Sequence, residues 1–208
     1  MNDFFCSLAL QYNFNSIKNY ALDGGDLNIC GSDGRSLLTC FIDGYMNFGD
    51  PYTKAENDLF QEYMDDDSFW NAFLPEVAKH PLDERASGIK DQLDFLIDHG
   101  CNPNLCEMID GETETALMLA VCDRDYYLAE YLLGKGANPG LWLLEDNKNK
   151  YDKEYWLLDE LDIGFEDGCH GERAEASLRI AELLYSAGLT DWQGKFICFD
   201  SNGHASLR

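Results

Sequence analysis

Residues 115–139 read Thr115-Ala-Leu-Met-Leu-Ala-Val-Cys-Asp-Arg-Asp-Tyr-Tyr-Leu-Ala-Glu-Tyr-Leu-Leu-Gly-Lys-Gly-Ala-Asn-Pro139 and predict two helices followed by a turn. The hydroxyl of Thr115 stands directly before an apolar run and can cap a helix by accepting from free backbone N–H groups. A second run places Leu128, Tyr131 and Leu132 at helical spacing. Gly136 then suits a left-handed helix cap, and the following Asn-Pro prevents the helix from continuing.

The same pattern of an apolar helix ending at glycine recurs in three other segments. They are Ile17-Lys-Asn-Tyr-Ala-Leu-Asp-Gly-Gly25-Asp-Leu-Asn28, Leu93-Asp-Phe-Leu-Ile-Asp-His-Gly100-Cys-Asn-Pro-Asn104 and Ile180-Ala-Glu-Leu-Leu-Tyr-Ser-Ala-Gly188-Leu-Thr-Asp191. The hydroxyl-capped helix recurs once, in Asp33-Gly-Arg-Ser-Leu-Leu-Thr-Cys40. One helix–turn unit is therefore present four times, which is the signature of a repeat protein.

The segment Thr115–Ala120 followed by Leu128–Pro139 resembles an ankyrin repeat, and residues 96–104 resemble the end of another. The similarity is strong over residues 93–139 and fair over 14–42 and 176–192. It implies an all-α fold, an ankyrin-type helical repeat solenoid that forms a single domain over residues 1–208. Stacked helical repeats bury a continuous seam and expose a concave face that suits protein recognition.

The spacing of the repeats departs from the family. Ankyrin repeats run near 33 residues, but Gly25, Gly100, Gly136 and Gly188 lie 75, 36 and 52 residues apart. The two long intervals predict insertions at about 43–86 and 140–175. Short helices are expected within these insertions, at residues 55–64, 68–79, 141–144 and 155–161.

A short C-terminal β-hairpin is also predicted. Residues 195–199 read as a strand, and Asn202-Gly203 suits the type I′ turn of a hairpin. A frayed tail is the alternative.

The composition restricts the classes of partner. The formal net charge is −24, and such a field repels nucleic acid and anionic lipid, which need Lys and Arg to neutralise phosphate. The N-terminus lacks the basic region and cleavage site of a signal peptide, and no run approaches the length of a membrane span. We therefore expect a cytoplasmic protein, a monomer, with no direct nucleic-acid or membrane binding.

The residue types that carry catalysis or bind metals do not form a recognisable motif. The eight cysteines form no CxxC pair and are best interpreted as free thiols packed like small hydrophobes. Adjacent Cys169 and His170 cannot usually turn their side chains towards each other, as a catalytic dyad would require. We expect no enzyme activity, no cofactor and no metal; an enzyme built on an inserted subdomain remains the minor alternative.

Two groups of residues are candidates for binding a partner. The resemblance to ankyrin repeats points to turn tips and inner helices, namely Asp33, Arg35, Asp110, Glu112, Glu114, Asp123, Arg124 and Tyr126. The insertions add aromatic side chains that lie among acidic residues in the sequence. The candidates there are the aromatic Tyr63, Trp70, Trp142 and Tyr151 and the acidic Asp65, Asp66 and Asp67. Residues 43–84 and 144–175 together hold 22 of the 39 acids. Aromatic rings can anchor a basic partner that carboxylates steer, although rings such as Phe69, Phe73 and Trp156 can equally be the core of inserted helices.

These features favour a binding module that blocks or escorts a basic protein, in the manner of an immunity protein or an inhibitor. Two alternatives stay open: a DNA-mimicking inhibitor of a nucleic-acid-binding enzyme, and a generic ankyrin-like adaptor whose charge serves only solubility.

Overall fold

The computed structural model describes residues 1–49, 76–85, 88–107, 114–139, 172–189, 197–199 and 205–207. The α-helices are α1 (Asn2–Leu10), α2 (Phe14–Leu22), α3 (Leu37–Gly44), α6 (Ile89–Asp98), α7 (Ala116–Cys122), α8 (Tyr126–Gly134) and α10 (Glu172–Ser186). A π-helical turn, η1 (Tyr45–Gly49), extends α3, and two 3-10 turns, η2 (Glu76–Lys79) and η3 (Leu82–Glu84), precede α6. Two short strands, β1 (Ile197–Phe199) and β2 (Ala205–Leu207), follow α10.

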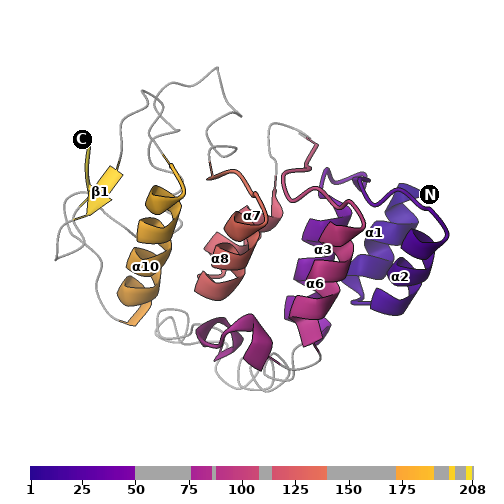
Figure 1. The fold of residues 1–208 in the computed structure, drawn as a ribbon, viewed down its shortest axis with the longest axis horizontal. Helices are drawn as coiled ribbons and strands as arrows, with labels where there is room; N and C mark the ends of the chain where they lie inside the picture. The colour runs from indigo at the N-terminus through magenta and orange to yellow at the C-terminus, as the bar shows by residue number, and fades with distance from the viewer. Residues whose placement is uncertain are drawn as a thin grey trace, which may run out of the picture.

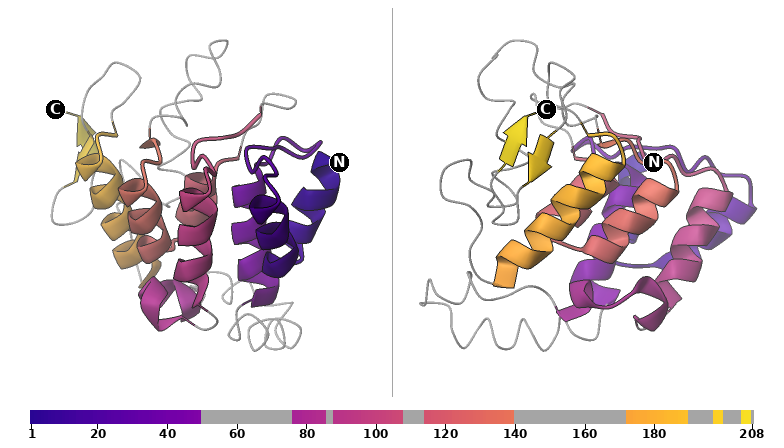
Figure 2. Two further views of the ribbon diagram at one scale, coloured as in Figure 1. Left: turned by 45° about the vertical axis from the view of Figure 1, so that its right-hand side comes forward. Right: turned by 60° about the vertical axis from the view of Figure 1, so that its left-hand side comes forward.

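The helices stand side by side in a row, with the N- and C-termini at opposite ends (Figure 1). The helices α6, α8 and α10 lie in front in this view, with α3 and α7 behind them, and the two layers remain visible after rotation (Figure 2). We call α1, α3 and α7 the inner helices and α2, α6, α8 and α10 the outer helices. The pairs α1/α2, α3/α6 and α7/α8 are the first three repeats, and α10 is the outer helix of the fourth. The all-helical repeat fold predicted from the sequence is confirmed.

The predicted helix caps form at both ends of the repeats. The hydroxyls of Ser36 and Thr115 accept from the backbone N–H of Thr39 and Met118 at 3.1 and 3.2 Å, and so begin α3 and α7. At the other end, Gly100, Gly136 and Gly188 have φ of 97°, 91° and 96°. This left-handed geometry lets the chain satisfy carbonyls that the helix end leaves free.

The first repeat differs from the prediction by one residue. The left-handed residue after α2 is Gly24, with φ 82°, and not Gly25. Gly25 is needed for a different reason, because a Cβ there would lie 2.4 Å from the ring of Tyr20.

Two asparagines join neighbouring repeats at the turns that follow the outer helices. Asn28 donates to the carbonyl of Gly100 at 2.8 Å and accepts from the N–H of Asn102 at 2.9 Å. Asn104 makes the same pair of bonds with Gly136 and Asn138, at 2.9 and 2.7 Å. The two Asn-Pro dipeptides take part in this seam through the backbone N–H groups of Asn102 and Asn138. The seam runs beside a core of buried leucine, isoleucine and alanine side chains.

The first insertion lies inside one repeat, between inner helix α3 and outer helix α6. Of the helices predicted within the insertions, only the end of 68–79 is described, and it is the 3-10 turn η2. The segments 55–64, 141–144 and 155–161 lie outside the described residues.

The C-terminal hairpin is present, but not with the predicted two-residue turn. Strands β1 and β2 pair antiparallel, with Phe199 opposite Ala205. A two-residue turn at Asn202-Gly203 would instead pair Phe199 with Ser206. The connection therefore spans residues 200–204, and the register is shifted by one residue from the prediction.

Candidate interaction surface

Three acidic side chains, from the turns before α3 and α7 and from the inner helix α3 itself, meet at Arg35. The Nε of Arg35 lies 2.8 Å from Asp33 Oδ2, and its Nη1 lies 2.7 Å from Asp43 Oδ2. Glu114, which stands just before the cap of α7, is 3.8 Å from Nε. We call Asp33, Arg35, Asp43 and Glu114 the Arg35 cluster. It brings together three predicted partner-binding residues and adds Asp43.

Three carboxylates around one guanidinium leave the Arg35 cluster with excess negative charge. The pKa of Glu114 is raised, first by burial and then by the charges of Asp43 and Asp33. Burial also acts on Asp33, but the hydrogen bonds from Arg35 outweigh it and hold the pKa of that carboxyl below its usual range. Arg35 therefore stabilises its nearest carboxylates, whereas Glu114 is only partly compensated.

Asp123 extends this acidic surface to the turn between α7 and α8. Burial raises the pKa of Asp123 to about 7, and the charges of Asp125, Asp43 and Glu114 add to the effect. The neighbouring Arg124 opposes the shift but does not cancel it. At neutral pH this carboxyl is thus poised between its charged and neutral forms, and a cation placed near it would favour the charged form.

Two other predicted partner-binding residues lie in contacts within the chain. Arg124 has the left-handed φ of 55°, and its Nε donates to Ser177 Oγ on α10 at 3.3 Å. The hydroxyl of Tyr126 donates to Glu130 at 3.1 Å, and its ring lies 4.2 Å from the guanidinium carbon of Arg179. These residues join α8 to α10.

The remaining predicted residues lie outside the described parts of the chain, so nothing places them relative to the Arg35 cluster. They are Tyr63, Asp65, Asp66, Asp67, Trp70, Asp110, Glu112, Trp142 and Tyr151.

A buried ion pair that the sequence did not suggest fixes the end of the first insertion. Arg85 forms two 2.5 Å bonds with the carboxylate of Asp125, and both side chains are only 1% exposed. Asp125 also caps α8 by accepting from Leu128 N–H at 3.0 Å. In the first repeat, the neutral Asn13 caps α2 from the equivalent turn. The third repeat has the acid Asp125 at this position, and Arg85 supplies the compensating charge. The comparison of Asn13 with Asp125 marks the acid as a difference between the repeats, but it does not identify Arg85 as its partner.

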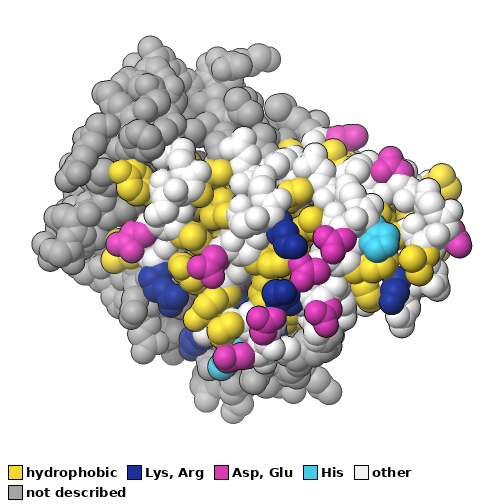
Figure 3. Space-filling view, viewed as in Figure 1, with side chains coloured by type: hydrophobic (Ala, Val, Ile, Leu, Met, Phe, Trp, Pro, Cys, Tyr) yellow, Lys and Arg dark blue, Asp and Glu magenta, His cyan; other side chains and the backbone are white. Residues whose placement is uncertain are grey.

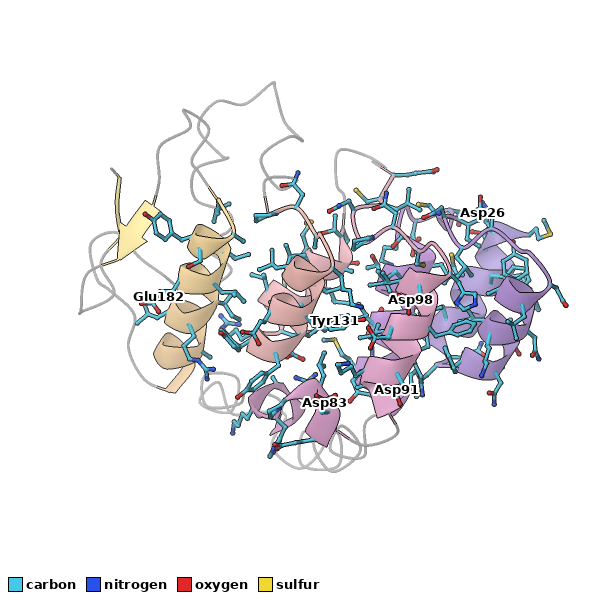
Figure 4. The ribbon with its side chains drawn as sticks, viewed as in Figure 1. Asp26, Asp83, Asp91, Asp98, Tyr131 and Glu182 are labelled. Carbon is cyan, nitrogen blue, oxygen red and sulfur yellow. The ribbon has the colours of Figure 1, made fainter. Side chains whose placement is uncertain are left out.

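The outer helices carry a separate set of charges. Asp94 on α6 binds Lys90 at 3.0 Å, Lys135 at 2.6 Å and the hydroxyl of Tyr131 at 2.9 Å. Hydrogen bonds from Lys135, Lys90 and Tyr131 outweigh burial and lower the pKa of Asp94 to about 2. Acids and bases are interspersed on this side of the molecule (Figure 3), and Tyr131 points towards α6 (Figure 4).

Comparison with known proteins supports the assignment made from the fold. Residues 113–142 match the family model described as Ankyrin repeat. The matched residues include all of α7 and α8, the third repeat. No solved structure matches the chain. The chain therefore contains an ankyrin repeat at these residues.

Ankyrin repeats are typically interaction modules without enzyme activity, and they bind protein partners. This chain is accordingly a protein–protein interaction module. Within the described residues, no helix is long and apolar enough to cross a membrane.

Proposed function

We propose that this protein is a cytoplasmic interaction module that binds a basic protein and neutralises it, as an inhibitor or immunity protein does. The observation that carries the proposal is the excess of carboxylates in the Arg35 cluster, continued by Asp123. Basic side chains from a partner would compensate the charges that Arg35 leaves unpaired. The Arg35 cluster would then stabilise the complex electrostatically as well as attract the partner.

The net charge of −24 supports the same partner class. It would steer a cationic protein towards the chain and repel nucleic acid. Asp65, Asp66, Asp67 and the aromatic residues of the two insertions are proposed to extend the interface. The 3-10 turns at the end of the first insertion pack near α6 and α8.

Affinity capture with matched charge variants tests the proposal. The immobilised full chain is compared with the variant Asp43→Asn/Glu114→Gln, which removes two charges from the Arg35 cluster. The control is Asp98→Asn/Glu182→Gln, which removes two charges from exposed positions on outer helices, both labelled in Figure 4. We expect the wild type and the control to retain a basic protein that the cluster variant loses, and salt to release it. An activity assay of the retained protein, with and without the chain, then tests inhibition.

Each part of the proposal can fail separately. If both double variants lose the retained protein to the same extent, total charge and not the Arg35 cluster controls binding. Retained proteins that are not basic, and that resist elution by salt, would favour the adaptor alternative. Displacement of the partner's nucleic acid by the chain would favour the DNA-mimic form of inhibition.

A further inference from the structure

Two cysteines meet across the contact between the inner helices α1 and α3. Cys6 lies in the middle of α1 and Cys40 in the middle of α3, and these residues are 4% and 0% exposed. The thiol of Cys40 donates a hydrogen bond to the sulfur of Cys6. Both thiols are free in this structure, and the proposed binding function makes no use of them.

Contacts on either side of this pair hold the two helices at a fixed level. Near the start of α1, the carboxylate of Asp3 accepts from the backbone N–H of Ser32, in the turn before α3, at 2.6 Å. Near the end of α1, the carbonyl oxygen of Ala9 lies so close to Gly44 of α3 that a Cβ there would clash with it. The helices therefore run in the same direction with their backbones in contact. Each cysteine stands one turn before the Ala9–Gly44 contact in its own helix.

The surroundings of Cys6 favour its thiolate form. The hydrogen bond from Cys40 lowers the pKa of Cys6, and the charge of Arg35 acts in the same direction. Burial and nearby carboxylates oppose the shift but do not cancel it. The thiolate is the nucleophilic form of cysteine, and Cys6 also keeps the small exposure that Cys40 lacks. Cys6 is thus suited to react first with a small oxidant, and Cys40 is placed to react second.

Two other buried cysteines are held in the thiol form. The thiol of Cys101 donates to the carbonyl of Leu27 at 3.6 Å, and burial raises its pKa to about 12. Burial likewise raises the pKa of Cys30 to about 11. These thiols are weak nucleophiles at neutral pH, which sets Cys6 apart from them.

We propose that hydrogen peroxide converts Cys6 and Cys40 into a reversible disulfide that locks the first repeat to the second. The Cys6 thiolate attacks one peroxide oxygen, the O–O bond breaks, and the released hydroxide takes up the proton that Cys6 gave up. The sulfur of Cys40 then attacks the sulfur of the Cys6 sulfenic acid, the S–O bond breaks, and the hydroxyl group leaves as water with the Cys40 proton. The two sulfurs lose two electrons, which reduce the peroxide to two waters. A small dithiol restores both thiols by thiol–disulfide exchange.

The disulfide would act on the position of α3. A crosslink restricts the unfolded chain, so it would stabilise the packing of α1 against α3. Helix α3 carries Asp43 of the Arg35 cluster, and the lock would fix that helix against the first repeat. The inference concerns contacts within the chain, so it stands or falls separately from the proposed partner.

Peptide mapping of the full chain tests the bond directly. The folded protein is treated with hydrogen peroxide, alkylated to block the remaining thiols and digested with trypsin. Trypsin cleaves after lysine and arginine, so peptides 1–18, 19–35 and 36–54 each hold a single cysteine, namely Cys6, Cys30 and Cys40. We expect peptides 1–18 and 36–54 to be linked, and dithiothreitol to separate them.

Thermal unfolding of matched variants measures the effect of the bond. Peroxide should raise the Tm of the wild type by about 5–10 °C. Cys6→Ala and Cys40→Ala should each abolish both the linked peptide and this rise. Cys101→Ala is the control, because Cys101 is also buried but its thiol is bonded to a backbone carbonyl, and it should retain both.

The wild-type map decides the proposal even if an alanine variant fails to fold. Cys6 and Cys40 that remain separately alkylated, under peroxide treatment that oxidises the 89% exposed Met1, would overturn it. A link from Cys6 to Cys30 in place of Cys40 would also overturn it, as would a link that forms only in urea. An equal rise in Tm for Cys40→Ala would show that the stabilisation comes from a different oxidation, and would refute the lock.

Discussion

The pKa values of aspartates on the outer and inner sides of this protein are shifted in opposite directions. On the outer side, Asp94 is bound by two lysines and a tyrosine, and its pKa falls to about 2. On the inner side, Asp123 lies near other carboxylates, and burial raises its pKa to about 7. The first arrangement neutralises acid and stabilises the fold, whereas the second leaves acid that a basic partner could neutralise. A net charge of −24 therefore does not describe one uniform surface.

Asp123 and Asp125 make the same contrast within one turn. They flank Arg124, yet Asp125 is paired with Arg85 and Asp123 has no comparable partner among the described residues. Two acids of the same turn thus differ in whether a cation pairs with them. The following predictions test the contrast between paired and unpaired acids.

The largest effect is expected from breaking the buried pair. Arg85→Ala leaves the carboxylate of Asp125 buried without its cation, and should lower the free energy of unfolding by about 3–5 kcal/mol. Urea denaturation followed by circular dichroism measures the loss. The matched variant Arg85→Ala/Asp125→Asn removes the stranded charge and keeps a side chain that can cap α8, as Asn13 caps α2. The double variant should recover part of the loss; equal destabilisation would show that the charge of Asp125 is not responsible.

A smaller effect of opposite sign is expected at Asp123. The folded protein holds the proton of this carboxyl up to a pKa of about 7, above the ordinary value near 3.9. The raised pKa means that stability is fully present at low pH and falls as the pH rises towards 7. Asp123→Asn removes this loss, so the variant should be more stable than the wild type at pH 8, by about 1–2 kcal/mol after allowance for partial exposure.

Paired unfolding experiments at pH 4, 6 and 8 measure this effect, because other titrating groups cancel in the difference between variant and wild type. The difference should shrink towards zero at the acid end. Asp98→Asn controls for the change in net charge. A constant difference at all three pH values would contradict a role for the titration of Asp123.

The repeats could be predicted from the sequence because their signals are local. Thr115 and Ser36 stand directly before the helices that they cap, and Gly100 directly follows its helix. The cap at Gly24 in place of Gly25 shows the limit of such signals, because two adjacent glycines both tolerate the left-handed conformation. The hairpin register depends in the same way on strand pairing, and not on the Asn-Gly dipeptide alone.

The candidate site could be predicted only in part, because its contacts join distant residues. Asp33, Arg35 and Glu114 were found from their place in the repeat, and Asp43 completes the cluster from the far end of α3. Arg85 and Asp125 are 40 residues apart, and their pairing depends on how an irregular insertion returns to the repeats. No spacing rule relates such residues, so the pair becomes visible only when the fold is known.

The smallest effect is expected at the paired acid of the outer side. Asp94 has a lowered pKa, so its contribution to stability is present above the ordinary pKa near 3.9 and is lost as the pH falls towards about 2. Asp94→Asn should therefore cost about 0.5–1 kcal/mol at pH 7, reduced from the full shift because solvent screens a surface pair. Urea denaturation at low and high salt measures this cost, which should shrink in high salt. Asp123→Asn is the internal comparison, since it is expected to stabilise the protein under the same conditions. If both substitutions destabilise equally, the two sides of the molecule do not differ in how they compensate acid.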